Sequence, residues 1–137
     1  MTGNRWHVCM TVLKTYARVF VDDIPAALVP LEQVYGRPAD LRFAFDGAEL
    51  AAVGDVLLIA GSPDSYRSGI GPLVVDDVDA TVSMLVDSGA DVVSEFVAET
   101  GRGAYVHHEG VTVEYLQWND DVLSRVLGDR ATDDRTG

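Results

Sequence analysis

The sequence predicts an α+β protein of two tandem βαβββ modules, which form a curved mixed sheet around a concave pocket. Three observations carry this prediction. The segment FVDDI at residues 20–24 recurs as VVDDV at residues 74–78. Each copy follows a strand-like run and precedes apolar residues at helical spacing. Three further strand-like runs then follow each helix, separated by turn pairs such as Asp46-Gly47.

Module one covers about residues 15–61 and begins with a strand over residues 15–21. Asp23 is predicted to cap the first helix, because a carboxylate there accepts hydrogen bonds from free backbone N–H groups. The helix ends at Gly36. Pro30 predicts a kinked or late-starting helix, because proline removes one intrahelical hydrogen bond. The remaining strands are predicted at residues 39–45, 48–53 and 55–60.

A linker over residues 62–69, rich in Ser, Gly and Pro, joins module one to module two, about residues 70–118. Asp77 caps the second helix and Gly89 ends it. Three strands follow, at residues 91–97, 103–108 and 111–117, with Glu109-Gly110 as the last turn.

The ends of the chain are less patterned. The C-terminal tail at 119–137 is predicted to hold a short helix over residues 119–128 and a frayed polar end. Residues 6–13 could add an edge strand without a defined place. Neither module is long enough to bury a good core alone, so residues 1–137 are predicted to form a single domain.

Period-two alternation assigns the side chains of each strand to two faces. In the first strand, Ala17, Val19 and Val21 should face the helix, while Tyr16, Arg18 and Phe20 face the opposite side. In module two, a two-residue turn at Glu109-Gly110 pairs strand residues that share a face. This pairing assigns to the side opposite the helix Tyr105, His107, Thr112, Glu114 and Leu116.

The same alternation assigns the other strands. To the side opposite the helices it assigns Arg42, Ala44, Glu49, Ala51, Val53, Val56, Leu58, Ala60, Ile70, Pro72 and Val74. To the core beneath the first helix it assigns Leu41, Phe43, Phe45, Leu50, Leu57 and Ile59. The face opposite the helices thus mixes aromatic, small and a few charged residues. Such a mixture is typical of a concave ligand pocket, and a dimer interface can have a similar composition. The residues predicted to bind a ligand are Tyr16, Arg18, Phe20, Arg42, Leu58, Tyr66, Ile70, Tyr105, His107 and Glu114.

Charge and composition exclude several classes of protein. The 10 Lys and Arg residues against 22 Asp and Glu give a formal net charge of −12, which repels phosphate backbones and argues against nucleic-acid binding. No apolar run reaches the roughly 18 residues of a membrane span. Residues 1–14 lack the apolar stretch of a signal peptide, and one cysteine cannot form an internal disulfide. We therefore expect a cytoplasmic protein.

The motifs VDDI, VDDVDATVSMLVDSGA and TGRGAYVHHEGVTVEYLQ, with their order and spacing, resemble the vicinal oxygen chelate superfamily. This superfamily includes glyoxalases, bleomycin resistance proteins and extradiol dioxygenases. The resemblance covers about residues 15–118. It departs at His107-His108-Glu109-Gly110, where the family usually has an Asp-Pro-x-Gly turn.

The resemblance implies four metal-ligand positions, which correspond here to Tyr16, Leu58, Ile70 and Glu114. Only Glu114 can bind a divalent cation well, because Leu58 and Ile70 have hydrocarbon side chains. We therefore expect no metal and no cofactor, as in the metal-free antibiotic-binding members of the family. This implies a homodimer that sequesters a small aromatic or hydrophobic molecule, such as an antibiotic or secondary metabolite. The alternatives are a metal-free isomerase, lyase or cyclase that uses Glu114 with His107 or Tyr105 in acid–base chemistry, and a glyoxalase-like metalloenzyme.

Overall fold

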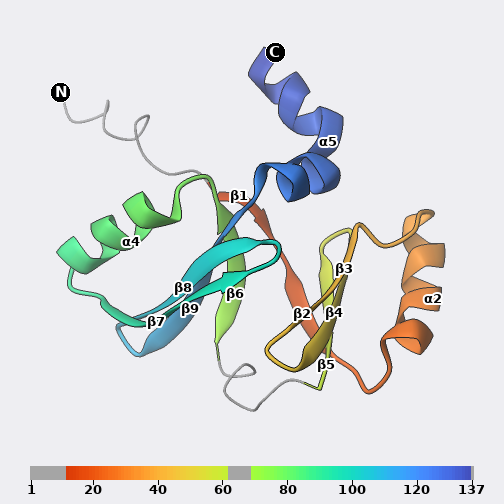
Figure 1. The fold of residues 1–137 in the computed structure, drawn as a ribbon, viewed down its shortest axis with the longest axis horizontal. Helices are drawn as coiled ribbons and strands as arrows, with labels where there is room; N and C mark the ends of the chain where they lie inside the picture. Colours follow the sequence, from red (N-terminus) through yellow and green to blue (C-terminus); the bar gives the residue numbers. More distant parts are fainter. Residues whose placement is uncertain (1–11, 62–68, 137) are drawn as a thin grey trace. The chain divides into compact units, whose positions relative to one another are not determined.

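The computed structural model describes residues 12–61 and 69–136, with side chains described as far as Gly128. The chain divides into two compact units. Among the described residues, unit 1 consists of residues 12–15 and 69–119, and unit 2 of residues 16–61 and 120–136. Each unit contains one βαβββ module, so the predicted α+β repeat is confirmed (Figure 1).

Unit 2 contains a four-stranded mixed sheet and its covering helix. The elements are β2 (Ala17–Phe20), α2 (Ile24–Tyr35), β3 (Leu41–Phe45), β4 (Ala48–Val53) and β5 (Val56–Ala60). The strand order is β2-β5-β4-β3, with β2 parallel to β5 and the other neighbours antiparallel. Asp46 and Gly47 both have positive φ, at 52° and 81°, as a tight hairpin turn requires.

Helix α2 begins and ends at the predicted signals. The Asp23 carboxylate accepts a hydrogen bond from the Ala26 N–H at 3.1 Å. Gly36 ends the helix in the left-handed conformation, with φ 72°, and its N–H donates to the Glu32 carbonyl at 2.8 Å. The helix runs from Ile24 through Pro30, so the late start that was one of the two predicted outcomes is wrong.

The face of the unit 2 sheet that packs beneath α2 is the opposite of the one predicted for β3 to β5. Ile24 and Leu28 of α2 pack against four sheet residues, Ala51, Val53, Leu58 and Ala60. The prediction put these four on the side opposite the helix. Both faces of β4 and β5 carry buried apolar residues, such as Leu50 and Ala51, so alternation alone does not identify the covered one. The assignment of Val19 and Val21 of the first strand to the α2 side agrees with the structure, since Val19 pairs with Leu58 and Val21 packs against this core.

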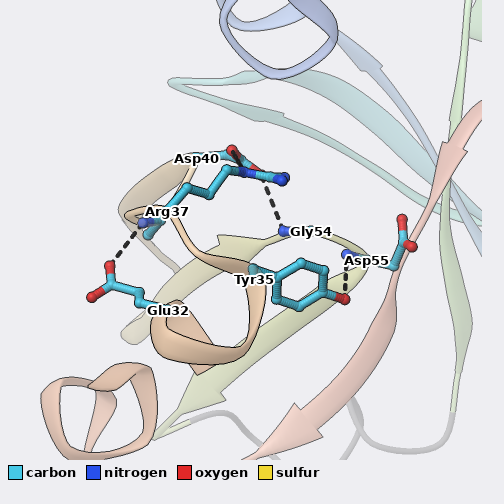
Figure 2. A network of polar contacts seen from close by, with 7 residues as sticks. Glu32, Tyr35, Arg37, Asp40, Gly54 and Asp55 are labelled. Carbon is cyan, nitrogen blue, oxygen red and sulfur yellow. Dashed lines mark hydrogen bonds and ion pairs between the residues drawn. The ribbon is translucent and has the colours of Figure 1, made fainter. Parts of the chain in front are cut away.

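Polar contacts join the C-terminal end of α2 to the β4–β5 turn (Figure 2). The Asp40 carboxylate accepts hydrogen bonds from the Arg37 guanidinium, at 3.2 and 3.3 Å, and from the Gly54 N–H at 3.2 Å. The Tyr35 hydroxyl accepts a hydrogen bond from the Asp55 N–H at 3.3 Å. We call these five residues the α2 clasp. It holds the helix end against a turn of the sheet.

Unit 1 contains a five-stranded mixed sheet and helix α4. Its elements are β1 (Val12–Thr15), β6 (Ile70–Val75), α4 (Val78–Asp87), β7 (Asp91–Ala98), β8 (Gly101–His108) and β9 (Val111–Trp118). The strand order is β1-β6-β9-β8-β7. Strand β6 is parallel to β9, and the other neighbours are antiparallel. The N-terminal segment thus does supply an edge strand, at Val12–Thr15, and it pairs with the second module rather than the first.

Helix α4 covers one face of this sheet. Asp77 caps it by accepting a hydrogen bond from the Ala80 N–H at 3.0 Å. Val82 and Leu85 of the helix pack against Ala104 and Val106 of β8. In Figure 1, α4 is drawn in green, and strand β7 follows it in the chain before β8. The predicted capping residue and helix position in module two are therefore confirmed.

Helix α5 (Asp120–Thr136) follows the last strand. Its backbone is non-helical at Gly128, with φ 53° and ψ −136°, so two helical segments meet there. The segment before Gly128 agrees with the predicted short helix. The helix continues beyond Gly128 to Thr136, over residues where the prediction placed a frayed polar end. No helix in the described parts of the chain is both long and apolar enough to cross a membrane.

Candidate functional site

The face of the unit 1 sheet opposite α4 carries most of the predicted site residues that belong to this unit. We call it the Glu114 face. The strand register assigns to it Lys14, Val74, Phe96, Gly103, Tyr105, His107, Thr112, Glu114, Leu116 and Trp118. The predicted pairs Tyr105 with Glu114 and His107 with Thr112 are confirmed. The positions of Tyr105, His107 and Glu114 on one face therefore follow from the two-residue turn at Glu109-Gly110.

Glu114 is a buried carboxylate on this face, with 4 % of its surface exposed. Its neighbours along and across the sheet include Tyr105, directly opposite on β8, and Leu116, which is also buried. Burying a carboxylate among apolar groups is costly unless hydrogen bonds or charges compensate it. A carboxylate on a sheet face can accept hydrogen bonds from a ligand as well as from the protein.

An aromatic pair lies beside Glu114. The Phe96 and Tyr105 ring centroids are 5.5 Å apart, with the planes tilted by 46°. Phe96 also lies over Gly103: a Cβ on that glycine would be 2.5 Å from Cζ of the Phe96 ring. The absence of a side chain at Gly103 thus leaves room for Phe96 on this face.

His107 lies on the same face, nearer the β8–β9 turn. Its Nδ1 atom is 2.9 Å from the Thr112 hydroxyl oxygen. This hydrogen bond restrains the ring orientation and leaves Nε2 as the other nitrogen available for acid–base chemistry or hydrogen bonding. His107 is exposed, in contrast to Glu114.

Sequence reasoning did not assign Lys14 or Phe96 to the Glu114 face. Lys14 pairs with Val74 and so lies on this face, but the place of its strand depended on a pairing with β6 that is distant in sequence. Phe96 follows a register shift between Val92 and Ser94 of β7, which interrupts simple alternation. Continuing the register from Gly101 back through Ala98 would have found Phe96 opposite Gly103.

Three predicted ligand-binding residues lie on other faces than predicted. Leu58 is 1 % exposed in the core beneath α2. Arg42 pairs with Ala51, so it shares the α2 side, and it is exposed. Ile70 pairs with Val113 on the α4 side and is 54 % exposed, because a register shift between Ile70 and Leu73 breaks the alternation on which the prediction relied. Tyr66 lies outside the described residues.

The remaining predicted residues, Tyr16, Arg18 and Phe20, belong to unit 2. Arg18 pairs with Leu57 and Phe20 with Ile59, on the side of the sheet opposite α2, as predicted for the first strand. Tyr16 is 8 % exposed. Its burial, reinforced by the nearby carboxylates of Asp40 and Asp55, raises the pKa of its hydroxyl well above the usual range. Tyr16 therefore remains a neutral phenol at physiological pH.

The described residues do not fit the four-ligand metal centre implied by the family resemblance. Leu58 and Ile70 have no donor atoms, and Leu58 packs beneath α2. Across residues 12–61 and 69–128, no group of three His, Cys, Asp or Glu side chains is arranged to hold a metal ion.

No protein-family profile matches the sequence, and no curated protein matches it. Solved structures do match. An uncharacterised protein from Methanosarcina mazei is 31 % identical, with a TM-score of 0.71 over 80 % of this chain and 94 % of that one. Methylmalonyl-CoA epimerase from Mycobacterium tuberculosis is 16 % identical, with a TM-score of 0.62 over 82 % and 93 % of the two chains. A hypothetical protein from Bacillus halodurans is 13 % identical, with a TM-score of 0.60 over 81 % and 96 %. For the last two, the likeness concerns the fold.

Proposed function

Since this chain is by its fold a member of the vicinal oxygen chelate superfamily, we propose that it is a metal-independent binding protein for a small molecule. The molecule has an aromatic or hydrophobic body and at least one N–H or O–H donor. An antibiotic or a secondary metabolite has this chemistry, and binding would sequester it. We further propose that the protein acts as a homodimer.

The observation that supports this proposal most is that one face of the unit 1 sheet carries the Glu114 carboxylate directly opposite Tyr105, which forms a ring pair with Phe96. A ligand's hydrogen-bond donor would bind its carboxylate, and a hydrogen bond to a charged acceptor is worth about 1.5–3 kcal/mol. Phe96 and Tyr105 would contact the aromatic body, with their tilted ring pair as one wall. Small-molecule sites are usually lined by apolar side chains with a small number of polar groups, as this face is.

Metal independence is supported by the positions that other members of the fold use for a cation. Leu58 and Ile70 supply only hydrocarbon there, so one carboxylate, Glu114, would have to hold the ion. Catalytic zinc sites use three protein ligands, and a single carboxylate does not supply them. Metal analysis of protein purified without a chelator should find less than one equivalent. A full equivalent of a transition metal would contradict the proposal.

The direct experiment is native mass spectrometry of the purified protein, followed by titration with any compound that copurifies. Binding should saturate, and the compound should be recovered unchanged after long incubation with the protein. Recovery of a chemically altered compound would contradict sequestration.

Replacing Glu114 by glutamine should weaken binding of that compound about tenfold, because a neutral amide accepts a weaker hydrogen bond than a carboxylate. Isothermal titration calorimetry measures the change. Glu109→Gln is the matched control, because this substitution removes the same charge at an exposed position in the β8–β9 turn. Equal affinities for the two variants would contradict the assigned role of Glu114.

The second candidate function is a metal-free isomerase, lyase or cyclase. The observation in its favour is that Glu114 and His107 share one face of β8 and β9, so a carboxylate and an imidazole are available there. An enzyme of this kind would convert the copurified compound, and Glu114→Gln would abolish turnover while changing affinity less. Product formation therefore separates the two functions.

A further inference from the structure

A groove lies on the α4 side of the unit 1 sheet, on the face opposite Glu114. It has a volume of about 170 Å³. Helix α4 and strands β7 and β8 line it, through Val78, Asp79, Val82, Ser83, Glu95, Arg102, Gly103 and Ala104. Valine and alanine side chains make the apolar part. The polar groups are Asp79 and Ser83 on the helix, with Glu95 and Arg102 on the sheet.

Arg102 is the only cationic side chain among these lining residues, and it forms an ion pair with Asp79. The Arg102 guanidinium donates to both carboxylate oxygens of Asp79, at 3.0 and 2.6 Å. This contact holds the pKa of the Asp79 carboxyl below its usual value. Asp77, the cap of α4, and Glu95 also act on the Arg102 charge. Three carboxylates thus act on one guanidinium, which leaves an excess of negative charge beside the groove.

Two polar groups of the groove, on Glu95 and Ser83, can accept hydrogen bonds from a ligand. Within the described residues, neither the Glu95 carboxylate nor the Ser83 hydroxyl has a hydrogen bond to the protein. Both can accept hydrogen bonds, and an ammonium group carries three donors and no acceptor. Val78, Val82 and Ala104 offer apolar contact for a short hydrocarbon body in the same groove.

We propose that this groove binds a small organic amine in its protonated form, with the ammonium group on Glu95 and Ser83 and the hydrocarbon body against Val78 and Val82. The excess of carboxylates favours a cation over an anion of the same shape. The net charge of −12 acts in the same direction by attracting cations to the protein. This site is separate from the Glu114 face and does not depend on the function proposed for that face.

The test is a titration of the intact protein with n-butylammonium chloride, followed by ¹H–¹⁵N chemical shifts. Butan-1-ol and sodium butyrate are the neutral and anionic probes of the same carbon chain. Saturable shifts at the first turns of α4 and at Arg102 to Ala104, produced by the ammonium and much less by the other two, would support the proposal. Equal responses to the amine and the alcohol, or shifts spread over all acidic surfaces, would overturn it.

Glu95→Gln should weaken n-butylammonium binding by up to about fivefold, the upper end of the range expected for one exposed charge pair. Ser83→Ala is the second variant and should weaken it less. Glu109→Gln removes the same charge at an exposed turn and should leave the affinity unchanged. Thermal unfolding of each variant checks that the fold is retained. An affinity that is the same for Glu95→Gln and Glu109→Gln would show that the groove is not the site.

Discussion

Replacing Leu58 by alanine should lower the free energy of unfolding by about 2–5 kcal/mol. Leu58 is 1 % exposed and packs with Ile24 and Leu28 of α2. The loss has two parts, the transfer free energy of the deleted atoms and the cavity left where neighbouring side chains cannot collapse. Urea denaturation, monitored by circular dichroism, measures the difference from the unsubstituted protein.

Ile70→Ala is the matched control for this substitution. Ile70 is 54 % exposed, so the same kind of truncation should cost less than about 1 kcal/mol. Both residues stand at positions that the family resemblance assigns to metal ligands, yet the structure gives them different surroundings. If Leu58→Ala costs no more than Ile70→Ala, the core beneath α2 is assigned to the wrong face of the sheet.

Replacing Gly54 by alanine should lower the free energy of unfolding by about 2–4 kcal/mol. Gly54 has φ 58°, a conformation that an L side chain adopts only with strain. A Cβ there would also overlap the Tyr35 ring at its Cε1 and Cζ atoms. That ring cannot easily move, because its hydroxyl accepts from the Asp55 N–H and the Arg37 guanidinium lies 5.6 Å from its centroid (Figure 2). The same denaturation experiment measures the effect.

Gly47→Ala separates the two contributions at Gly54. Gly47 has φ 81°, but a Cβ added there would meet no atom within 4 Å, so only the backbone strain of about 1–2 kcal/mol remains. In a Tyr35→Ala background, Gly54→Ala should cost about as little as Gly47→Ala, since the steric contact is gone. A cost at Gly54 that Tyr35→Ala does not reduce would contradict the packing of the α2 clasp.

The candidate site of module two was predicted well because its strands have a clear polarity. Glu114 and Thr112 alternate with Val113 and Tyr115, and the Glu109-Gly110 turn admits one register. In module one, Leu50 and Ala51 are both buried although they face opposite sides. Alternation there identifies two faces and cannot say which one the helix covers. Leu58 and Arg42 were misplaced for that reason.

The sequence by itself determined the repeated βαβββ order, the caps of both helices and the hairpin that brings Tyr105 and Glu114 together. These features depend on residues within a few positions of one another, where capping, turn conformation and alternation act directly. Only the tertiary structure decided that β1 joins the second module, that α2 covers the Leu58 face and that α4 closes a groove with Glu95. Such contacts depend on which apolar surfaces bury each other across long sequence separations, and several arrangements satisfy the same local pattern.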